Sequence, residues 1–417
     1  MFTIEGKYNQ AVCYAKVCED EAVEQIKGML DTPFTEGCKV RIMPDVHTGT
    51  GCTIGTTMTV KDKVVPNVVG VDIGCGMYTV KLDVKEIDLE AFDTVCHSIP
   101  SGKSVWEGRK ENFDISELKC FRQLKDTRRL IRSLGTLGGG NHFIEIDRAE
   151  DGTLYLVIHS GSRNLGKQVA DIYQSLAVDL QSGKEEYFQK REEIIRNYKE
   201  QGRRSEIQPA LKALAAEYEK TSAAYPEDLC WLYGTYMEDY LHDVKICQRY
   251  ARRNRELMAE IILDKSGLKA AESFHTVHNY IDTDEMILRK GAIAAHEGEK
   301  VLIPINMRDG SILAYGKGNP EWNYSAPHGA GRVMSRTKAK ATVLLEDFIR
   351  SMEGIYSTSV CESTIDESPM AYKSLEDIID VVRGSVDIIE VLRPVYNFKA
   401  TDDQVPEWKL KKAARKG

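Results

Sequence analysis

The residues able to do chemistry gather in five short glycine-containing strings and in a sixth string that holds two histidines. The strings are MPDVHTGTGCTIG at 43–55, GVDIGCG at 70–76, GTLGGGNHFIEI at 135–146, VIHSGSRNLG at 157–166, HTVHNYI at 275–281 and SAPHGAGRVMSR at 325–336. Glycine beside histidine, aspartate or cysteine lets the backbone approach a ligand closely or adopt a positive φ. So many strings in one chain predict a single large site assembled from loops.

Asp72 and Cys75 stand three positions apart, and the intervening Ile73-Gly74 allows both side chains to face one point from a turn. A carboxylate and a thiolate at one point suit a divalent metal ion. The alternative is a capping aspartate beside a buried structural cysteine. Glycines on both sides of Cys75 favour the metal site, because a packed core cysteine has no need of them.

Three histidines are natural partners for this pair, because imidazole is the commonest metal ligand. His142, His159 and His278 each adjoin an amide or a small residue. A lone histidine on a strand is more often structural, but three of them beside Asp72 and Cys75 predict ligands. Five ligands favour two metal ions that share the Cys75 thiolate, and two metals suit phosphoryl transfer.

His328 lies in a different setting, Pro-His-Gly-Ala-Gly-Arg, where its glycine neighbours expose it and Arg332 follows. Imidazole can act as a covalent nucleophile that forms a phosphoramidate, and a nearby arginine can hold the phosphate with two hydrogen bonds. A metal ligand or a turn histidine is the alternative. His47, near Asp45, could contact substrate or metal. The remaining histidines, His97, His242, His275 and His296, are interpreted as structural.

Familiar nucleotide-binding motifs are missing. The chain has no G-x-x-x-x-G-K-[ST] loop, and GAGRVM at 329–334 has only the first two glycines of a dinucleotide fingerprint. The K-x-D-G motif of ATP-dependent nucleic-acid ligases is absent as well.

Both strands and helices are predicted to position these residues. Apolar runs broken by glycine predict buried strands at Val64–Val71, Met77–Leu82 and 153–159. From 167 to 266 glycine becomes scarce and charges alternate, which is typical of solvated helices and includes a long amphipathic run after Pro226.

Further along the chain, residues 336–352 are predicted to be helical. A helix followed by a strand is predicted over 374–392, ending at Arg393-Pro394. We therefore expect a mixed α/β (α+β) fold in which 1–417 is a single compact body of sheets flanked by helices, with a helical insertion at 167–266.

Composition limits the class of protein and the kind of surface that could bind a partner. The 417 residues include 56 Lys and Arg against 64 Asp and Glu, a formal net charge of −8, so nucleic-acid binding must use a local basic groove. Hydrophobic residues at 42% exclude wholesale disorder, and ten scattered cysteines form no C-x-x-C pair. No run of about 18 apolar residues occurs, so we expect a soluble cytoplasmic protein with no membrane contact. Residues 400–417 are expected to form a basic, mobile tail.

Taken together, these strings resemble the RtcB family of RNA-splicing ligases. PDVH, GVDIGCG, GGGNHFIE, HSGSRNLG, HNYI and HGAGR stand in family order between about Met43 and Arg336, with a weaker similarity near Lys399. Any one string is weak evidence, whereas six in order are highly specific. The resemblance implies a compact α and β architecture with the site in a central cleft.

The resemblance also implies a chemistry. Family members join RNA ends with a 2′,3′-cyclic phosphate or 3′-phosphate to 5′-hydroxyl ends, in tRNA splicing or RNA repair, and use GTP and two manganese ions. A histidine attacks the α-phosphorus of GTP, and the resulting histidine–GMP passes GMP to the RNA 3′-phosphate, giving an RNA-3′-pp-G end. The 5′-hydroxyl then attacks and releases GMP. A cyclic phosphate is first opened to the 3′-phosphate. Such RNA, tRNA halves among it, is the implied partner, and the need for an activating protein stays open.

Site residues are carried over by motif. His328 becomes the guanylated nucleophile, and the implied metal ligands are Asp72, Cys75, His142, His159 and His278, with Cys75 bridging both ions. The implied nucleotide-binding residues are Asn141, His142, Phe143, Ile144, Glu145, His278, Asn279, Pro304, Ile305, Asn306, Met307, Ser311, His328, Gly329, Ala330, Gly331 and Lys399. Among them, Glu145 would hold the guanine edge and Lys399 the base. The residues expected to contact RNA are Asp45, Arg163 and Arg332.

Two other interpretations compete with an RNA ligase. A two-metal phosphodiesterase or phosphatase acting on RNA ends would use the same metal ligands, with His328 as an acid or base and with no covalent nucleotide. A non-catalytic protein that binds RNA ends is disfavoured, because no expected metal ligand is missing. GTP dependence and a covalent adduct distinguish the ligase from the phosphodiesterase.

Overall fold

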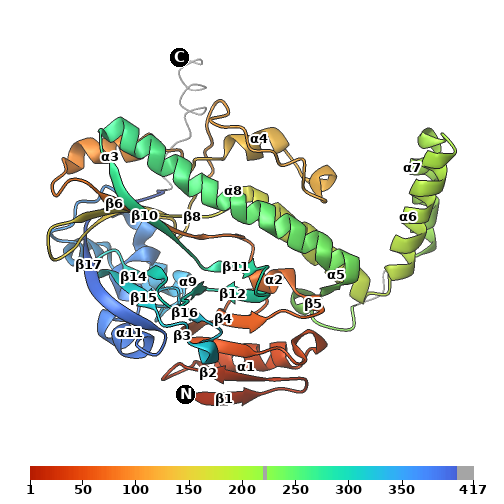
Figure 1. Cartoon of the computed structure of the whole chain (residues 1–417), viewed down its shortest axis with the longest axis horizontal. Coiled ribbons are helices and arrows are strands. Elements are labelled where there is room, and N and C mark those ends of the chain that lie inside the picture. The colour runs from red at the N-terminus through yellow and green to blue at the C-terminus, as the bar shows by residue number, and fades with distance from the viewer. Residues whose placement is uncertain (219–222, 402–417) are drawn as a thin grey trace.

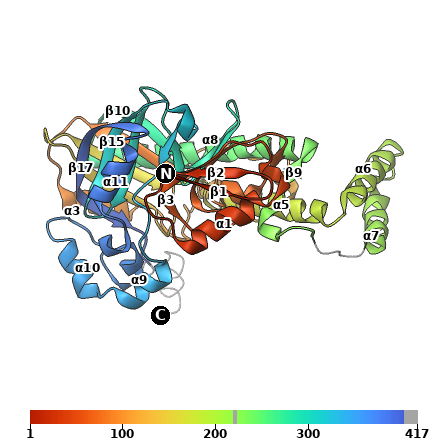
Figure 2. The same ribbon diagram turned by 90° about the horizontal axis from the view of Figure 1, so that it is seen from below.

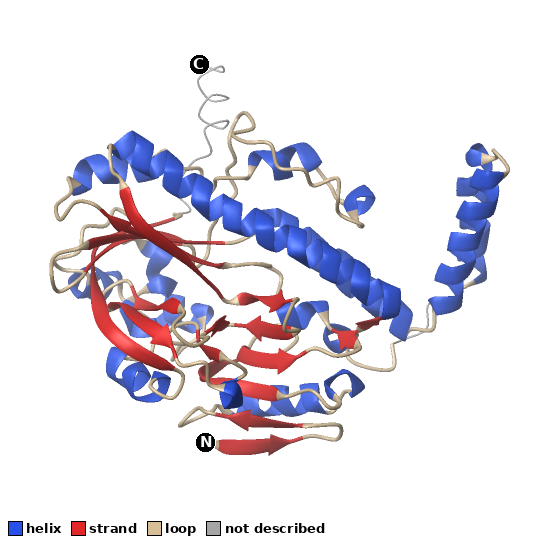
Figure 3. Cartoon of the chain, viewed as in Figure 1, coloured by secondary structure: helices blue, strands red, loops and turns tan. Residues whose placement is uncertain are grey.

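The computed structural model describes residues 1–218 and 223–401, and its helices pack on two main β-sheets (Figure 1, Figure 3). This arrangement confirms the mixed helix-and-strand fold predicted from the sequence. The basic tail expected at 400–417 falls outside the described residues from position 402 onward. Among the described helices, none is long and apolar enough to cross a membrane.

The first sheet has the strand order β1-β2-β3-β4-β12-β11, with β2 and β3 parallel and the other pairs antiparallel. Its strands are β1 (Phe2–Glu5), β2 (Gln10–Cys13), β3 (Val40–His47), β4 (Ile54–Thr59), β11 (Asn279–Asp282) and β12 (Ile287–Lys290). Helix α1 (Asp20–Leu30) buries a stripe of apolar residues at helical spacing, Ala22, Ile26, Met29 and Leu30, and lies beside β1 and β2 (Figure 2).

The second sheet has the strand order β10-β6-β8-β7-β17-β15-β14 and is antiparallel throughout. Its strands are β6 (Gly76–Leu82), β7 (Phe143–Arg148), β8 (Leu154–Ser160), β10 (Ala270–Val277), β14 (Lys300–Asn306), β15 (Gly310–Gly316) and β17 (Val386–Lys399). The sheet curls until its edge strands meet, where the Leu302 amide of β14 donates to the Thr276 hydroxyl of β10 (3.2 Å). The curled sheet therefore has an inner face, filled by Met77, Phe143, Ala149, Tyr155, Val157, Leu302, Leu313 and Leu392.

Helix α8 (Gly234–Ser266) joins the two halves of the molecule (Figure 1). Its 33 residues span about 50 Å. Val244 and Tyr250 enter the core beneath the first sheet, while Met258 and Ile262 pack on the outer face of the curled sheet.

The other helices are α2 (Pro66–Val69), α3 (Leu89–His97), α4 (Thr127–Arg132), α5 (Arg163–Gln181), α6 (Glu185–Glu200), α7 (Ile207–Glu217), α9 (Arg336–Thr342), α10 (Leu345–Ser351) and α11 (Leu375–Val382). Two short strand pairs complete the fold, β5 (Lys63–Val64) with β9 (Leu232–Tyr233) and β13 (Ala292–Ala294) with β16 (Ser325–Pro327).

Two predicted strands need correction. The strand expected at Val64–Val71 is wrong: only β5 is extended, and the residues after it form α2, because Pro66 at the first helical position favours a helix. The strand expected to end at Arg393-Pro394 continues to Lys399, because the β17 register shifts between Pro394 and Tyr396 and a bulge accommodates the proline.

The range expected to be a helical insertion, 167–266, contains two kinds of helix. Helices α5 and α8 pack against each other inside the body. Helices α6 and α7 pair with one another and project away from it, and α6 has no buried residue (Figure 1, Figure 2).

Two buried polar side chains of α8 hold the loops that carry the candidate ligands. Asn254 Oδ1 accepts from the amides of Gly135 and Thr136 (2.7 and 3.1 Å), and its Nδ2 donates to the Gly161 carbonyl (3.1 Å). Arg255 Nη1 donates to the carbonyls of Gly74 and Ser160, both at 2.7 Å. These bonds fix the backbone next to Cys75 and His159, and next to Leu137, whose carbonyl contacts His142 Nδ1.

Replacing Asn254 with alanine should therefore destabilise the whole fold. The variant leaves several buried backbone groups without partners, so we expect the free energy of unfolding to fall by about 2–4 kcal/mol. Urea denaturation measures this difference. Asn197→Ala, on the solvated helix α6, is the matched control and should change stability by less than about 0.5 kcal/mol. Equal effects of the two substitutions would contradict the clamping role of Asn254.

Candidate active site

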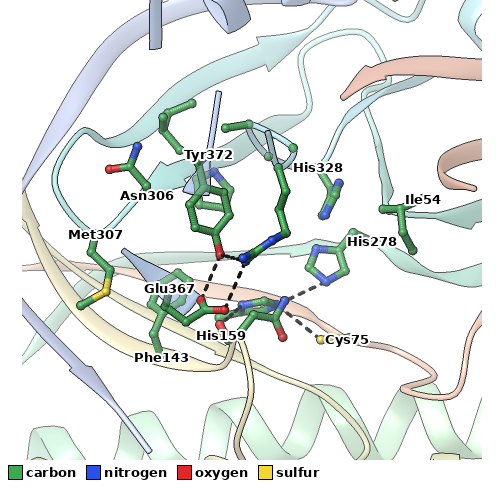
Figure 4. Close-up of a pocket in the computed structure, with 18 of the residues that line it drawn as sticks. Ile54, Cys75, Phe143, His159, His278, Asn306, Met307, His328, Glu367 and Tyr372 are labelled. Carbon is green, nitrogen blue, oxygen red and sulfur yellow. Dashed lines mark hydrogen bonds and ion pairs between the residues drawn. The ribbon is translucent and has the colours of Figure 1, made fainter. Parts of the chain in front are cut away.

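Five side chains, Asp72, Cys75, His142, His159 and His278, bring their donor atoms together at the mouth of the curled sheet. Figure 4 shows three of them, Cys75, His159 and His278. Cys75 Sγ lies 3.4 Å from Nε2 of both His142 and His159. His159 Nε2 lies 3.3 Å from His278 Nε2, and His142 Nε2 lies 3.1 Å from Asp72 Oδ2. The structure thus brings all five predicted metal ligands into one cluster.

Backbone carbonyls set which ring nitrogen faces this cluster. His142 Nδ1 lies 2.9 Å from the Leu137 carbonyl, and His159 Nδ1 lies 3.1 Å from the Asn141 carbonyl. Donation to these carbonyls places the proton on Nδ1 and leaves the Nε2 lone pair facing Cys75. Both rings are thereby oriented for metal binding.

Glycine allows the loops to approach this closely. A Cβ at position 161 would lie 2.2 Å from Asp72 Oδ1, so a side chain there would collide with the carboxylate. The amide of Ser162 instead donates to that oxygen at 2.9 Å. The glycine strings singled out in the sequence therefore serve close packing of ligand loops.

The protonation of the cluster suits a cation. Burial holds the pKa of His159 and His278 well below the usual value, and neighbouring histidines add to the effect. Burial also raises the pKa of the Cys75 thiol, and the Asp72 charge raises it further. Burial opposes ionisation of Asp72, but the hydrogen bond and charge of His142, together with the charge of Arg163, outweigh burial and lower the Asp72 pKa. A cation that binds Cys75 displaces a proton, so its affinity should rise with pH.

The donor set fits two cations. Asp72, Cys75 and His142 form one group of donors, and Cys75, His159 and His278 form the other, with the sulfur between them. A mixture of carboxylate, imidazole and thiolate suits a divalent transition metal, with manganese and zinc both compatible.

His328, which follows β16, faces this cluster, and its ring centroid lies 5.0 Å from that of His278 (Figure 4). Its Nδ1 lies 2.6 Å from Asp45 Oδ2, which also accepts from the His328 amide at 3.2 Å. Asp45, on β3, is completely buried. We expected Asp45 to contact RNA, but the structure turns its carboxylate toward His328 and away from the surface. With Nδ1 engaged, Nε2 is the ring nitrogen left for the cavity.

A cavity of about 300 Å³ extends from these groups along the mouth of the curled sheet. Most of the predicted nucleotide-binding residues line it, namely Asn141, Phe143, Glu145, His278, Asn279, Pro304, Ile305, Asn306, Met307, His328, Gly329, Ala330, Gly331 and Lys399, together with His47. Three do not line it. His142 lies in the cluster of candidate ligands, Ile144 packs in the core on the outer face of the sheet, and Ser311 is completely buried.

Glu367 is the centre of an ion-pair network in the cavity wall. Lys399 Nζ lies 2.9 Å from Glu367 Oε2, and the Tyr372 hydroxyl donates to the same oxygen at 3.0 Å (Figure 4). Arg332 and Arg336 also pair with this carboxylate. Burial opposes its ionisation, but the charges of Lys399 and Arg336 outweigh burial and lower the Glu367 pKa to about 2. The carboxylate is therefore ionised at neutral pH.

The two arginines expected to contact RNA lie in different cavities. Arg332 lines the first cavity, where its Nη2 donates to the Asp366 carbonyl (2.7 Å). Arg163 lines a second cavity of about 510 Å³, whose wall also includes Asp72 and His142. Three further cations, Lys103, Arg129 and Lys167, share that cavity. Of these two cavities, the second has the larger excess of cations over carboxylates in its wall.

Sequence reasoning missed Glu367, Tyr372 and Asn397. Glu367 and Tyr372 come from a segment of 3-10 turns without a glycine motif, so no local signal marked them. Asn397 stands two positions before Lys399 on β17, and its Nδ2 donates to Glu145. Strand alternation places Asn397 and Lys399 on one face and could have identified Asn397.

A family model described as "tRNA-splicing ligase RtcB" matches residues 25–127 and 106–400. The chain belongs to the RtcB family. The RNA-splicing ligase RtcB of Escherichia coli (strain K12) is 32% identical to it over 91% of this chain and 94% of that protein. The tRNA-splicing ligase RtcB of Aeropyrum pernix is 26% identical over 85% of this chain and 86% of that protein. The resemblance stated from the motifs is thus confirmed.

If the cluster of this RtcB chain holds metal, Cys75→Ala should weaken both positions at once, because the sulfur lies between the two donor groups. We expect manganese affinity to fall by more than about tenfold, measured by calorimetry on metal-stripped protein. Cys361→Ala, at a half-buried cysteine outside the cluster, should bind manganese as the wild type does. Unchanged binding by Cys75→Ala would refute a shared thiolate.

Proposed function

We propose that this RtcB-family chain is an RNA ligase that joins 3′-phosphate or 2′,3′-cyclic phosphate ends to 5′-hydroxyl ends through a covalent adduct of GMP with His328. The observation that carries the proposal is the placement of His328. Its Nδ1 is held 2.6 Å from a buried carboxylate, and its ring lies 5.0 Å from the ring of a candidate metal ligand. The names of the relatives, RNA-splicing ligases, support the same activity.

In the proposed first step, His328 Nε2 attacks the α-phosphorus of GTP. The N–P bond forms as the bond to the β-phosphate oxygen breaks, and pyrophosphate leaves. Asp45 keeps the proton on Nδ1, so Nε2 has its lone pair, and it stabilises the imidazolium that develops. The residues that would hold two manganese ions are Asp72, Cys75, His142, His159 and His278. Metal bound there supplies neutralisation of charge on the phosphoryl group and on the leaving pyrophosphate.

The cavity offers matching contacts for the rest of the nucleotide. Glu145, at 3% exposure, has a carboxylate that can accept from the N1–H and 2-amino group of guanine. Lys399 lies beside it in the wall, and the Gly329–Gly331 backbone, free of large side chains, can lie along the nucleotide. These contacts favour GTP as the nucleotide.

The second cavity suits the RNA. Arg163, Lys103 and Arg129 provide cations for backbone phosphates, which dominate affinity for nucleic acid. GMP moves from His328 to an oxygen of the RNA 3′-phosphate, so that the N–P bond breaks and a P–O bond forms. The 5′-hydroxyl oxygen then attacks the 3′-phosphate phosphorus and releases GMP. Water first opens a 2′,3′-cyclic phosphate. Candidate substrates are tRNA halves in splicing and broken RNAs in repair.

A guanylation assay tests the covalent step. Incubation with α-labelled GTP and manganese should give a labelled protein band that is acid-labile, as a phosphoramidate is. His328→Ala should give no band, whereas His97→Ala, at an exposed histidine on α3, should label as the wild type does. A wild type that hydrolyses RNA cyclic phosphates but forms no adduct with GTP or ATP would instead support the phosphodiesterase interpretation.

Asp45→Asn tests how the nucleophile is activated. The amide keeps the size of the side chain but cannot stabilise an imidazolium, so we expect the guanylation rate to fall by about 10²–10⁴-fold, as in other histidine–aspartate pairs. GTP binding to the variant should change much less, because Asp45 is buried behind His328. Single-turnover labelling and equilibrium binding separate the two effects. A variant that labels at the wild-type rate would exclude this role for Asp45.

A further inference from the structure

Asp147 is a carboxyl group buried inside the curled sheet, deeper than the nucleotide cavity. It stands two positions after Glu145 on β7, so both side chains point to the inner face. Its exposure is zero, and among the described residues no group donates a hydrogen bond to either of its oxygens. Apolar side chains, among them Val157, Leu313 and Leu392, fill the space around it. A charge there would lack both solvent and a counterion.

Few polar groups face Asp147 from the surrounding strands. Glu145 on its own strand and Ser311 on β15 lie within reach of its carboxyl. Tyr155 on β8 stands opposite it in the register. On β17, Asn397 donates to Glu145, and Lys399 is paired with Glu367. Lys399, the nearby cation, is therefore already paired with Glu367, and its charge acts to lower the pKa of Glu145.

Two carboxyls in such a site cannot both be ionised, because burial and mutual repulsion oppose the second charge. Burial raises the pKa of both acids. The charge of Glu145 raises the Asp147 pKa further, whereas hydrogen bonds from Asp147 and Asn397 and the charge of Lys399 act to lower the Glu145 pKa. These effects favour the proton on Asp147 and not on Glu145.

We propose that Asp147 is a positioning residue for nucleobase selection: as a neutral carboxylic acid it donates a hydrogen bond to Glu145 and keeps that carboxylate ionised and oriented toward the cavity. The inference rests on the proposed use of GTP. An ionised Glu145 accepts from guanine N1–H and from the 2-amino group, whereas adenine presents its unprotonated N1 at the same edge. Asp147 thus contributes to the preference for GTP over ATP without touching the nucleotide.

The pH dependence follows from this arrangement. As pH rises through the raised pKa of Asp147, the donated proton is lost and a second negative charge appears beside Glu145. Over the pH range in which guanine N1 itself stays protonated, the KM for GTP should then increase as pH rises. Asp147→Asn has an amide that donates at every pH, so its KM should not show this increase.

The experiment measures guanylation with GTP, ITP and ATP across pH for the wild type and three variants. We expect Asp147→Ala to raise the KM for GTP about tenfold or more, to change kcat little, and to reduce the GTP preference over ITP and ATP by a similar factor. Asp147→Asn should restore KM and base preference at neutral pH. Asp171→Ala, at an exposed residue on α5, is the control that should match the wild type.

The outcomes separate this inference from the proposed function. A wild type that forms no adduct refutes the proposed function, and with it the inference. A wild type that forms the adduct, together with an Asp147→Ala variant of unchanged base preference, overturns the inference alone. If the alanine variant does not fold, the asparagine variant still decides, because an alkaline KM increase equal to that of the wild type would show that Asp147 is not the titrating group.

Discussion

The hydrogen bonds from α8 to the ligand loops are the constraint on which the site depends. Donor atoms 3.1 to 3.4 Å apart require several loops to meet at one point, with their backbone groups buried. A buried amide or carbonyl without a partner is costly, and Asn254 and Arg255 provide the partners. The same helix packs on the cores of both sheets, so folding of the core and assembly of the cluster are linked.

The curled sheet explains why so many charged groups lie at low exposure. Alternation along β7 turns Ile144 and Ile146 outward to the core, and Phe143, Glu145 and Asp147 inward. Because β10 and β14 meet, the inward residues face a closed interior whose mouth is the cavity. Charges there interact strongly, since little water screens them, and each carboxylate needs a specific partner. Glu367 has Lys399, Glu145 has Asn397, and Asp147 remains neutral.

The sequence predicted the family and the candidate ligands that come together better than it predicted the partners of individual side chains. The glycines in the short strings around Cys75, His142 and His159 reflect close approach of the local backbone. Such strings can be recognised without knowledge of the fold. The role of Asp45 was not predictable in this way, because its contact with His328 joins residues 283 positions apart in the chain. Glu367 and Tyr372 reach the cavity only through tertiary packing. The β17 bulge at Pro394, which sets where Asn397 and Lys399 point, depends on pairing with β7 and not on local preference.

The two cavities bear on the order of the proposed steps. Asp72 and Asn141 line both of them, so the cavities meet at the cluster of candidate ligands, with His328 on one side and Arg163 on the other. A nucleotide bound on the His328 side and an RNA end bound on the Arg163 side would approach the same cluster from different directions. GMP transfer would then need movement of one phosphoryl group, and neither the base nor the RNA backbone would have to leave its contacts. This shared boundary would allow one cluster to serve the phosphoryl steps on both sides.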